Sequence, residues 1–533
     1  MTNDTDAQRI IERWDEMDAR RGTWRSHWQD VTDHVMPRKA DIETRRSPGE
    51  KRTEKQFDGT AADALDELAA MLFSNMTPPN AKWLSMSAVG LDDEETTVWL
   101  GESVDRYLAR LRQSNFYQQI HEAYIDIGAI GTAAVFTEEQ PITRPGFNGF
   151  AFRTLPIAEY VIDEDNQGIV DTVIRRFELT ARQAAQRWGD AAGKQVVEAA
   201  GVDKRQDEKF EYLHLLAPFD DKQWRQHRTA LNPWRSVYVS ARDSAVVQEG
   251  GFQEMPVHVG RWSLASGEIY GRSPAMKGLP FVRVLNLIVR WGLEALPYAL
   301  KPPLLVKEGT VQKGVNQVPG GITEYEGNPQ EAPRELTTQA RFDVAVDREE
   351  GYRQRIERSF AVDELRLRDS PQMTAEEVIE RRARMQRAIG PMVGRMEREL
   401  LRPLVERTWM MMFRAGEFGP PPPQLRQADE IEVVFEGPLA RAQRLDVVES
   451  GLNTLRALGN VGQVYPEIRD HFDADEWARD AATALGSGKY LRNADDVAGA
   501  RRQRAQQQLA TSQLQGGLQV AETAARVAGA TSE

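Results

Sequence analysis

The feature that most constrains the fold is one long apolar stretch near the middle of the chain. It reads LPFVRVLNLIVRWGLEALPYALKPPLLV, from Leu279 to Val306, and a polar or charged residue interrupts its first half every three or four positions. A membrane-spanning helix needs about 20 mostly apolar residues without such charges. We therefore predict no transmembrane helix here, but a long helix with a polar stripe along one side.

The ends of this helix are set by residues with known preferences. Ser273 suits the N-cap, and Pro274 suits the first helical position because the N–H that proline lacks would have no partner there. Pro302 and Pro303 cannot continue a helix, so the helix should end at about Lys301. At 1.5 Å per residue it would be roughly 40 Å long.

The polar stripe consists of four residues spaced by three, four and four positions: Arg283, Asn286, Arg290 and Glu294. This spacing places them on one face of the helix. The stripe can be the solvated side of an amphipathic helix, which is the commoner case for a single helix. It can also be the wet lining of a pore, with the apolar face of the helix packed on neighbouring subunits.

The rest of the chain predicts a mainly helical α+β protein. Apolar residues recur at helical spacing over 6–35, which predicts one helix that Pro37 ends. From about Gly146 short strand-like runs predominate, most of them bounded by turn residues, and one helix over 180–200 interrupts them. Strands are predicted within 149–155, 159–165, 169–179, 208–218, 234–241, 245–251 and 255–263.

A second long helix should begin at Thr374, where Glu377 three residues later can complete a capping box. Pro391 and Pro403 fall inside its apolar pattern, so we expect one bent helix that ends at Gly416. The basic, polar loop before it is held at a helix start with no catalytic motif nearby. We interpret it as a loop that touches something sliding past it.

Charge and composition exclude several classes of protein. The net charge of −13 over 533 residues argues against a protein that grips nucleic acid over a broad basic face, but not against one that lets nucleic acid pass. The chain has no cysteine, which excludes disulfides, thiolate zinc sites and cysteine nucleophiles. Its acidic, amphipathic N-terminus has no secretory apolar region.

No stretch carries a recognisable catalytic motif. GSGKY at 486–490 lacks the upstream glycine and the Ser or Thr after lysine that a P-loop requires. His27 and His34 lie seven apart with no further ligand nearby, and the acidic run 92–95 suits a helix N-terminus better than acid–base chemistry. We predict that the protein is not an enzyme and holds no metal or cofactor.

Several strings, taken in their order and spacing, resemble a known family. They are RWDEMDARRGTWRSHWQDVTDHVMP, DGTAADALDELAAMLFSNMTPPNAKWLSM, GEIYGRSPAMKGLPFVRVLNLIVRWGLEALPYALKPPLLV, QMTAEEVIERRARMQRAIGPMVGRMERELLRPLVERTW and YLRNADDVAGARRQRAQQQ. Over nearly its whole length the chain resembles the phage portal proteins, the head-to-tail connectors of T7-like, short-tailed phages.

The resemblance implies the portal fold, assembled as a ring of usually twelve subunits at one capsid vertex. Its parts on this sequence would be the wing (1–272, with a β-rich part from about 146), the first stem helix (273–301), a small β-containing clip (302–345), the second stem helix (346–364), the tunnel loop (365–373), the kinked wing helix with a return strand (374–437), and a helical crown with the C-terminal tail (438–533).

It also implies a channel for packaging and ejecting double-stranded DNA. The ring would dock the large terminase and later a tail adaptor or head-completion protein, and would contact the major capsid protein and scaffold. It would be part of the virion, assembled in the cytoplasm of the bacterial host, with no membrane partner. The candidate channel-lining residues are Arg283, Asn286, Arg290, Glu294, Arg353, Arg366, Arg368, Asp369, Ser370 and Gln372.

Two other interpretations stay open at this point. One is a packaging enzyme, such as the terminase ATPase or nuclease, against which the missing P-loop argues. The other is a structural head protein without a channel.

Overall fold

The computed structural model describes residues 2–47, 49–91, 93–141, 146–219, 232–309, 311, 314–316, 322–335, 342–361, 390–427, 430–436, 448, 450–458, 473–484, 491, 497–504 and 506–507. The chain forms two compact units, 1–437 and 438–533. The second unit contains helix α15 (Ala474–Ala484).

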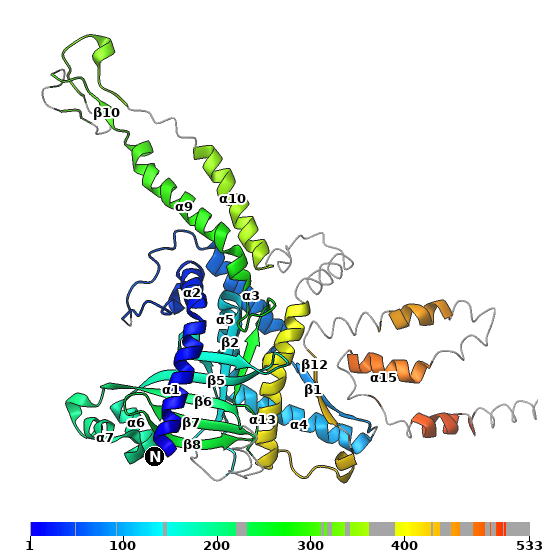
Figure 1. The fold of residues 1–533 in the computed structure, drawn as a ribbon. Coiled ribbons are helices and arrows are strands. Elements are labelled where there is room, and N and C mark those ends of the chain that lie inside the picture. Colours follow the sequence, from blue (N-terminus) through cyan, green and yellow to red (C-terminus); the bar gives the residue numbers. More distant parts are fainter. Residues whose placement is uncertain are drawn as a thin grey trace, which may run out of the picture. The chain divides into compact units, whose positions relative to one another are not determined.

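The first unit has the mainly helical α+β fold that the sequence predicts (Figure 1). Its helices are α1 (Thr2–Arg20), α2 (Gly22–Val35), α3 (Thr60–Met76), α4 (Glu94–Gln113), α5 (Phe116–Ile130), α6 (Ala181–Trp188), α7 (Lys194–Ala200), α9 (Pro274–Leu300), α10 (Phe342–Ser359) and α13 (Arg402–Arg414). Its strands are β1 (Leu84–Val89), β2 (Thr132–Glu139), β3 (Phe150–Leu155), β4 (Tyr160–Glu164), β5 (Val170–Thr180), β6 (Lys209–Pro218), β7 (Trp234–Ser240), β8 (Ala245–Phe252), β9 (Val257–Arg261), β10 (Leu304–Leu305), β11 (Arg334–Glu335) and β12 (Glu430–Phe435).

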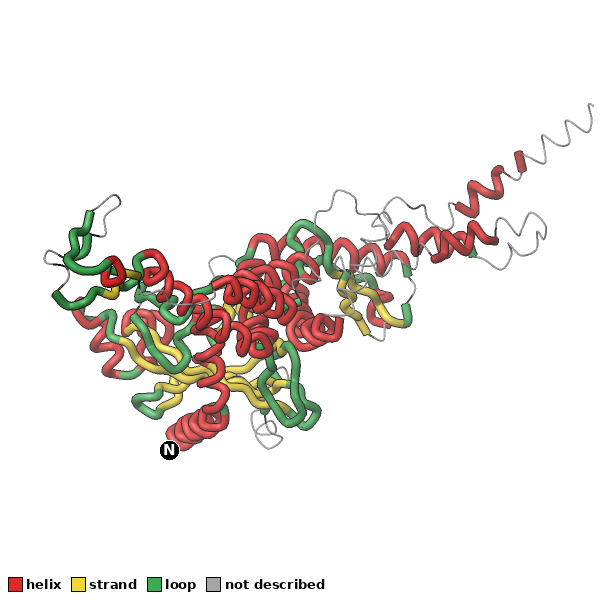
Figure 2. The backbone as a smooth tube through the Cα atoms, turned by 90° about the horizontal axis from the view of Figure 1, so that it is seen from above, coloured by secondary structure: helices red, strands yellow, loops and turns green. Residues whose placement is uncertain are grey.

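The largest sheet is antiparallel and has the strand order β4-β5-β6-β7-β8. On one face α1 packs through Trp14 and Met17 against residues such as Ile174. In the view from above, α1 lies beside these strands (Figure 2). On the other face α6 and α7 pack against the intervening residues, among them Phe177 and Tyr212. Because successive side chains of a strand point to opposite faces, the same strands contribute to both cores.

Two smaller antiparallel sheets have the orders β3-β2-β9 and β1-β12. We call the part of the first unit that contains the three sheets and the helices packed on them the body. All seven segments predicted to be strands are strands, β3 to β9. Strand β1 was not predicted. It pairs with β12 in a register that places Ser85 opposite Val434, so it joins segments far apart in the chain.

Helix α5 lies at the centre of the helical part. Every residue from Ala123 to Ile130 is buried, which requires packing on all sides. The helix ends at Gly131, whose φ of +89° is left-handed. A Cβ on Gly131 would lie 2.3 Å from the carbonyl oxygen of Gly271, and one on Gly271 would lie 2.1 Å from that of Gly131. The two backbones therefore touch just before α9 begins.

The predicted N-terminal helix is wrong in one respect, because it is two helices. The chain bends at Arg21 and Gly22, where glycine weakens the helix. The Arg21 side chain is only 2% exposed and its Nη1 donates to the carbonyls of Ile157 and Tyr160, at 2.6 and 2.7 Å. This buried arginine thus ties the bend to the β-rich part.

The predicted single helix over 180–200 is also two, α6 and α7. Gly189 and Gly193 lie between them with φ of +56° and +104°, which no helix contains. Helix α10 begins at Phe342, four residues before the predicted second stem helix. It ends at Ser359, and Ala361 has a left-handed φ of +58°.

The helix is irregular just before Pro403, whereas the predicted bend of the long helix stays a prediction. Residues Glu397–Leu401 form a π-helical turn directly before α13. Proline has no N–H to bond to the carbonyl four residues earlier, and a widened turn accommodates that loss. The helix ends at Arg414, close to the predicted Gly416, whose φ is +74°. Residues 374–389 of the prediction lie outside the described residues.

Candidate functional site

The N-terminus of α9 is fixed as the sequence predicts. The Ser273 hydroxyl accepts a hydrogen bond from the backbone N–H of Met276 at 3.0 Å and donates one to the Ala129 carbonyl at 2.7 Å. Pro274 occupies the first helical position. The helix ends at Leu300, and the Lys301 N–H still bonds to the carbonyl of Pro297.

Helices α9 and α10 run side by side, and β10 lies at the far end of α9 (Figure 1). We call this pair of helices the arm. Near the body the arm has a core, in which Val282, Leu285, Ile356 and Phe360 are each at most 1% exposed. This packed end anchors both helices.

Two arginines of the predicted stripe are exposed but carry ion pairs. Arg283 is 55% exposed and pairs with Asp30 of α2. Arg290 is 53% exposed, its Nε lies 2.8 Å from Glu294 Oε1, and its guanidinium lies 5.8 Å from the ring centre of Phe57. Exposed pairs of this kind are weak and exchangeable, so both guanidinium groups remain accessible to a phosphate.

Asn286 does not line a solvent-exposed stripe. It is 4% exposed, and its Oδ1 accepts the backbone N–H groups of Phe57 and Asp58 at 2.6 and 3.0 Å. Its Nδ2 donates to the Val282 carbonyl at 2.8 Å. The predicted channel-lining role of Asn286 is therefore wrong for its side chain, because a buried amide is used to hold a loop.

Asp58 extends this contact to the second helix of the arm. Its Oδ1 accepts the Thr60 N–H at the start of α3, at 2.9 Å. Its Oδ2 accepts from Nε and Nη2 of Arg353, each at 3.2 Å, and Arg353 also bonds Glu349. Arg353, predicted to line the channel, thus helps join α10 to the body. We call Asn286, Asp58 and Arg353 the arm junction.

The other five candidates belong to the predicted tunnel loop: Arg366, Arg368, Asp369, Ser370 and Gln372. They lie outside the described residues.

Farther along, α9 exposes large apolar side chains. Trp291 is 60% exposed, Leu293 57%, Tyr298 61% and Leu300 73%. Leu287 and Leu296, at 45% and 49%, belong to the same half of the helix. We call these six exposed side chains the apolar surface of α9. At 3.6 residues per turn, Leu287, Trp291 and Tyr298 lie on one side of the helix, and Leu293, Leu296 and Leu300 lie on the opposite side. Exposed apolar surface of this kind on a folded protein marks an interaction site.

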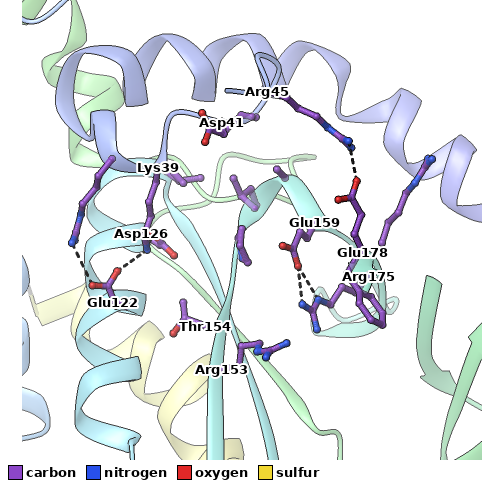
Figure 3. A pocket seen from close by; sticks show the side chains of 18 of the residues that line it. Lys39, Asp41, Arg45, Glu122, Asp126, Arg153, Thr154, Glu159, Arg175 and Glu178 are labelled. Carbon is purple, nitrogen blue, oxygen red and sulfur yellow. Dashed lines mark hydrogen bonds and ion pairs between the residues drawn. The ribbon is translucent and has the colours of Figure 1, made fainter. Parts of the chain in front are cut away.

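A cavity of about 860 Å³ lies on the body, between α5, the basic segment after α2, the end of β3, and strands β5 and β6 (Figure 3). Its lining is charged. Lys39 Nζ lies 2.9 Å from Glu122 and 2.6 Å from Asp126, and Arg175 Nη2 lies 2.8 Å from Glu159. Sequence reasoning did not find this cavity, because its residues come from five separate segments.

Burial and ion pairing act in opposite directions on its carboxyl groups. Burial raises the pKa of Asp126, and the nearby Lys39 offsets this only in part. Burial also opposes ionisation of Glu122, but Lys39 and Arg38 outweigh it and lower its pKa. Lys39 thus lowers the pKa of both carboxyl groups, and Arg38 lowers that of Glu122 further.

Two buried histidines lie elsewhere in the body, and burial lowers the pKa of both. His214 Nε2 hydrogen-bonds Ser236 at 2.9 Å, and its ring stacks on Tyr238 with centres 3.8 Å apart. Burial, with help from Arg407, lowers the pKa of His258 to about 3. Neither ring nitrogen of His258 has a hydrogen-bond partner in the part of the chain that the structure describes.

Within the same described ranges, no group of three or more His, Asp or Glu side chains is arranged to hold a metal ion. Nor do these residues include a helix that combines the length and apolar character needed to cross a bilayer.

Comparison with known proteins decides the family. Residues 7–490 match the family described as "Bacteriophage head to tail connecting protein". The chain belongs to the phage portal protein family. The "Probable portal protein" of Bordetella phage BPP-1 is 32% identical over 544 residues, covering 99% of this chain and 96% of that protein. The "Portal protein" of Salmonella phage epsilon15 is 27% identical over 522 residues, covering 95% and 92%.

The resemblance drawn from the sequence strings is therefore confirmed. Portal proteins are structural connectors of head and tail and components of the phage particle, so this portal protein is not an enzyme.

Proposed function

We propose that this portal protein forms a ring of about twelve copies at one capsid vertex, with a central channel for double-stranded DNA during packaging and ejection. In this proposal 1–272 is the wing, 273–301 and 346–364 are the two stem helices, 302–345 is the clip and 438–533 is the crown with the C-terminal tail. The segment 365–373 is the tunnel loop, and 374–437 is the kinked wing helix with its return strand.

The observation that carries the proposal is the apolar surface of α9, which has exposed side chains on two sides of the helix. Trp291, Leu293 and Leu300 are more than half exposed in a single chain, although burying an apolar side chain of this size stabilises a protein by roughly 1.5–3 kcal/mol. A second copy of the same chain, placed side by side, offers matching apolar side chains. Repetition of one such contact around an axis closes into a ring.

The charge balance supports a channel that does not hold DNA tightly. Twelve copies at −13 each would carry a formal charge of about −156. DNA is negative as well, with one phosphate charge per roughly 1.7 Å of duplex, so the ring as a whole would not attract it. Arg283 and Arg290 on the stem, with Arg366 and Arg368 in the tunnel loop, are the cations that we propose make weak, replaceable phosphate contacts. Such contacts position DNA without reading its sequence.

The partners follow from this arrangement. The clip would dock the large terminase during packaging, and then a tail adaptor or head-completion protein. The wing would contact the major capsid protein and scaffold during assembly in the cytoplasm of the bacterial host. A short-tailed phage is the type of particle that we propose.

Electron microscopy of the purified full-length protein in negative stain tests the assembly. We expect rings with a central hole and about twelve-fold symmetry. A protein that forms no closed hollow assembly, even at high concentration or with scaffold protein, would contradict the proposal. A hollow ring would also set aside a head protein without a channel, and absence of ATP hydrolysis would set aside a packaging ATPase.

A separate experiment tests the tunnel loop. Phages carrying Arg366→Ala with Arg368→Ala should package or retain less DNA than wild type, because the loop would lose both cations that contact phosphate. Packaged genome length is measured by pulsed-field electrophoresis, with Arg205→Ala and Arg242→Ala, both on the body, as the matched control. Wild-type length and retention in the loop variant would remove the loop from the mechanism.

A further inference from the structure

The cavity of Figure 3 contains charges that neither the ring nor the channel uses. Eight cationic and six anionic side chains line it, a cationic surplus in a chain whose net charge is −13. A local excess of positive charge on an acidic protein is not an average property of its surface. This local excess of positive charge suggests that an anionic ligand binds in the cavity.

The six lining carboxylates are already neutralised within the chain. Their cationic partners are Arg52 for Asp41, Lys39 for Asp126, Lys39 and Arg38 for Glu122, Arg175 for Glu159, Lys209 and Arg45 for Glu178, and Arg176 for Glu211. These carboxylates offer little attraction to a cationic ligand.

The cations are not all matched. Arg153, on β3, is exposed and forms no ion pair or hydrogen bond with any residue that the structure describes. Its charge interacts with Glu138 only at longer range, where it partly offsets the rise that burial causes in the pKa of Glu138. Arg45 is 81% exposed and holds Glu178 at 3.2 Å, although Lys209 holds the same carboxylate at 3.1 Å. Figure 3 shows Arg45 and Arg153 on opposite sides of the cavity. Two guanidinium groups are thus available to one ligand.

The neighbouring strand edge limits how a ligand can bind. Asn115 exchanges hydrogen bonds of 2.9 and 2.8 Å with the backbone N–H and carbonyl of Phe152 on β3. Gln119 Oε1 accepts the Thr154 N–H at 2.7 Å. Side chains of α5 therefore occupy the edge of β3, and a partner cannot add a strand there. Recognition must come from side chains.

A nucleic acid is a poor ligand for this cavity. Its successive phosphates would approach Glu122, Glu159, Glu178 and Glu211 as well as the arginines. A single anionic group avoids that repulsion, because it can lie between the guanidinium groups and away from the acids. Guanidinium matches the paired oxygens of a carboxylate or a phosphate.

We propose that this cavity binds one anionic group from a partner protein, a carboxylate of an acidic segment, with Arg153 as its main contact and Arg45 as the second. A carboxylate carries one charge, whereas phosphate carries close to two and would meet more repulsion from the lining acids. The proposal does not rest on ring formation, since every residue in it belongs to one chain.

Fluorescence anisotropy with the full-length protein tests this site. The probes are a fluorescein-labelled tetraglutamate peptide, a labelled tetralysine peptide and inorganic phosphate as competitor. We expect saturable binding of tetraglutamate that weakens with salt, and none of tetralysine. Arg153→Ala should weaken the binding of tetraglutamate about tenfold or more, because it removes charge-assisted hydrogen bonds. Arg45→Ala should weaken it less.

Arg9→Ala is the matched control, since Arg9 is an exposed arginine on α1 outside the cavity. Arg153→Lys keeps the charge and should keep part of the affinity, which separates a binding role from a folding defect. Phosphate that outcompetes the peptide, with the same dependence on Arg153, would overturn the assignment of a protein carboxylate as the ligand. Absence of saturable binding of either probe, or equal effects of Arg153→Ala and Arg9→Ala, would overturn the proposal.

Discussion

The large sheet and the far half of α9 bury apolar side chains to very different degrees. Ile174 in the sheet and Trp14 of α1, which packs on it, are 0% and 4% exposed, because helices of the same chain cover both faces of the sheet. On α9, Trp291 is 60% exposed and Leu300 73%. The sheet completes its core within one chain, whereas the arm leaves an apolar surface uncovered. In the proposed ring, this difference would separate the part of the portal protein that folds from the part that assembles.

The ion pairs of the body differ from those of the arm in a similar way. In the body, Arg261 is 1% exposed and joins Glu164 and Glu399, which are far apart in the sequence, at 2.9 and 3.0 Å. On the arm, Arg290 pairs with Glu294 one helical turn away, and both are exposed. Buried pairs leave a costly charge when one partner is lost, and exposed pairs do not.

The largest expected effect is on assembly. Leu293→Glu places a charge on the apolar surface of α9, so rings should be lost almost completely while the subunit stays folded. Size-exclusion chromatography with light scattering, together with negative-stain images, measures the assembled fraction. Lys277→Glu, an exposed site nearer the base of the same helix, should leave rings intact. Normal rings from the Leu293 variant would place the subunit contact elsewhere.

Removal of the buried arginine should be the most destabilising change within the body. Arg261→Ala leaves the carboxylates of Glu164 and Glu399 without their buried partner and should lower the free energy of unfolding by about 3–5 kcal/mol. Urea denaturation measures this. Arg290→Ala on the arm should cost at most about 1 kcal/mol. Similar losses for the two variants would erase the distinction between the regions.

The arm junction should show an intermediate effect. Asn286→Ala leaves the N–H groups of Phe57 and Asp58 without their acceptor, at a cost of about 1–3 kcal/mol. Hydrogen exchange should accelerate at these two amides. Asn75→Ala is the control, because the Asn75 side chain bonds the Met71 carbonyl of its own helix. Unchanged exchange at 57 and 58 would show that another contact holds the loop.

The expected effect that is smallest near neutral pH is on the pH dependence of the body. The folded-state pKa of His258 is about 3 and its ordinary value is 6.5, so the unfolded chain binds more protons between these values. This stabilising contribution is present above about pH 6.5 and is lost as the pH falls towards 3. His258→Phe should reduce the slope of unfolding free energy against pH by up to about 1.4 kcal/mol per unit.

Denaturation midpoints measured from pH 4 to 7 test that slope. His121→Phe is the control, since His121 is only half-buried. An identical slope in wild type and in the His258 variant would mean that this ring is not buried in its neutral form.

The elements that could be predicted from sequence are those with local signals. Ser273, Pro274 and the Pro302–Pro303 pair mark the ends of α9 within one residue. Short strand-like runs bounded by turn residues mark strands β3 to β9, with their ends within two residues. The breaks at Gly22 and Gly189 were missed because the apolar pattern continues across them, although glycine itself was a usable signal.

Features that join distant segments could not be predicted. Nothing near β1 indicates that it pairs with β12, and nothing near Arg153 indicates a cavity. Asn286 shows the limit of periodicity. A polar residue at stripe spacing can face water or can bond a buried backbone, and the spacing is the same for both.

The close contact between the backbones of Gly131 and Gly271 is the point about which α9 would tilt. A side chain on either glycine would push apart the segment that leads into α9 and the end of α5. Since α9 is roughly 40 Å long, a tilt of only about 5° at this contact would displace its tip by roughly 3–4 Å. In the proposed ring, a methyl group added at Gly271, 20 residues before Trp291, could thus misalign neighbouring arms without touching any of the surfaces by which those arms would meet.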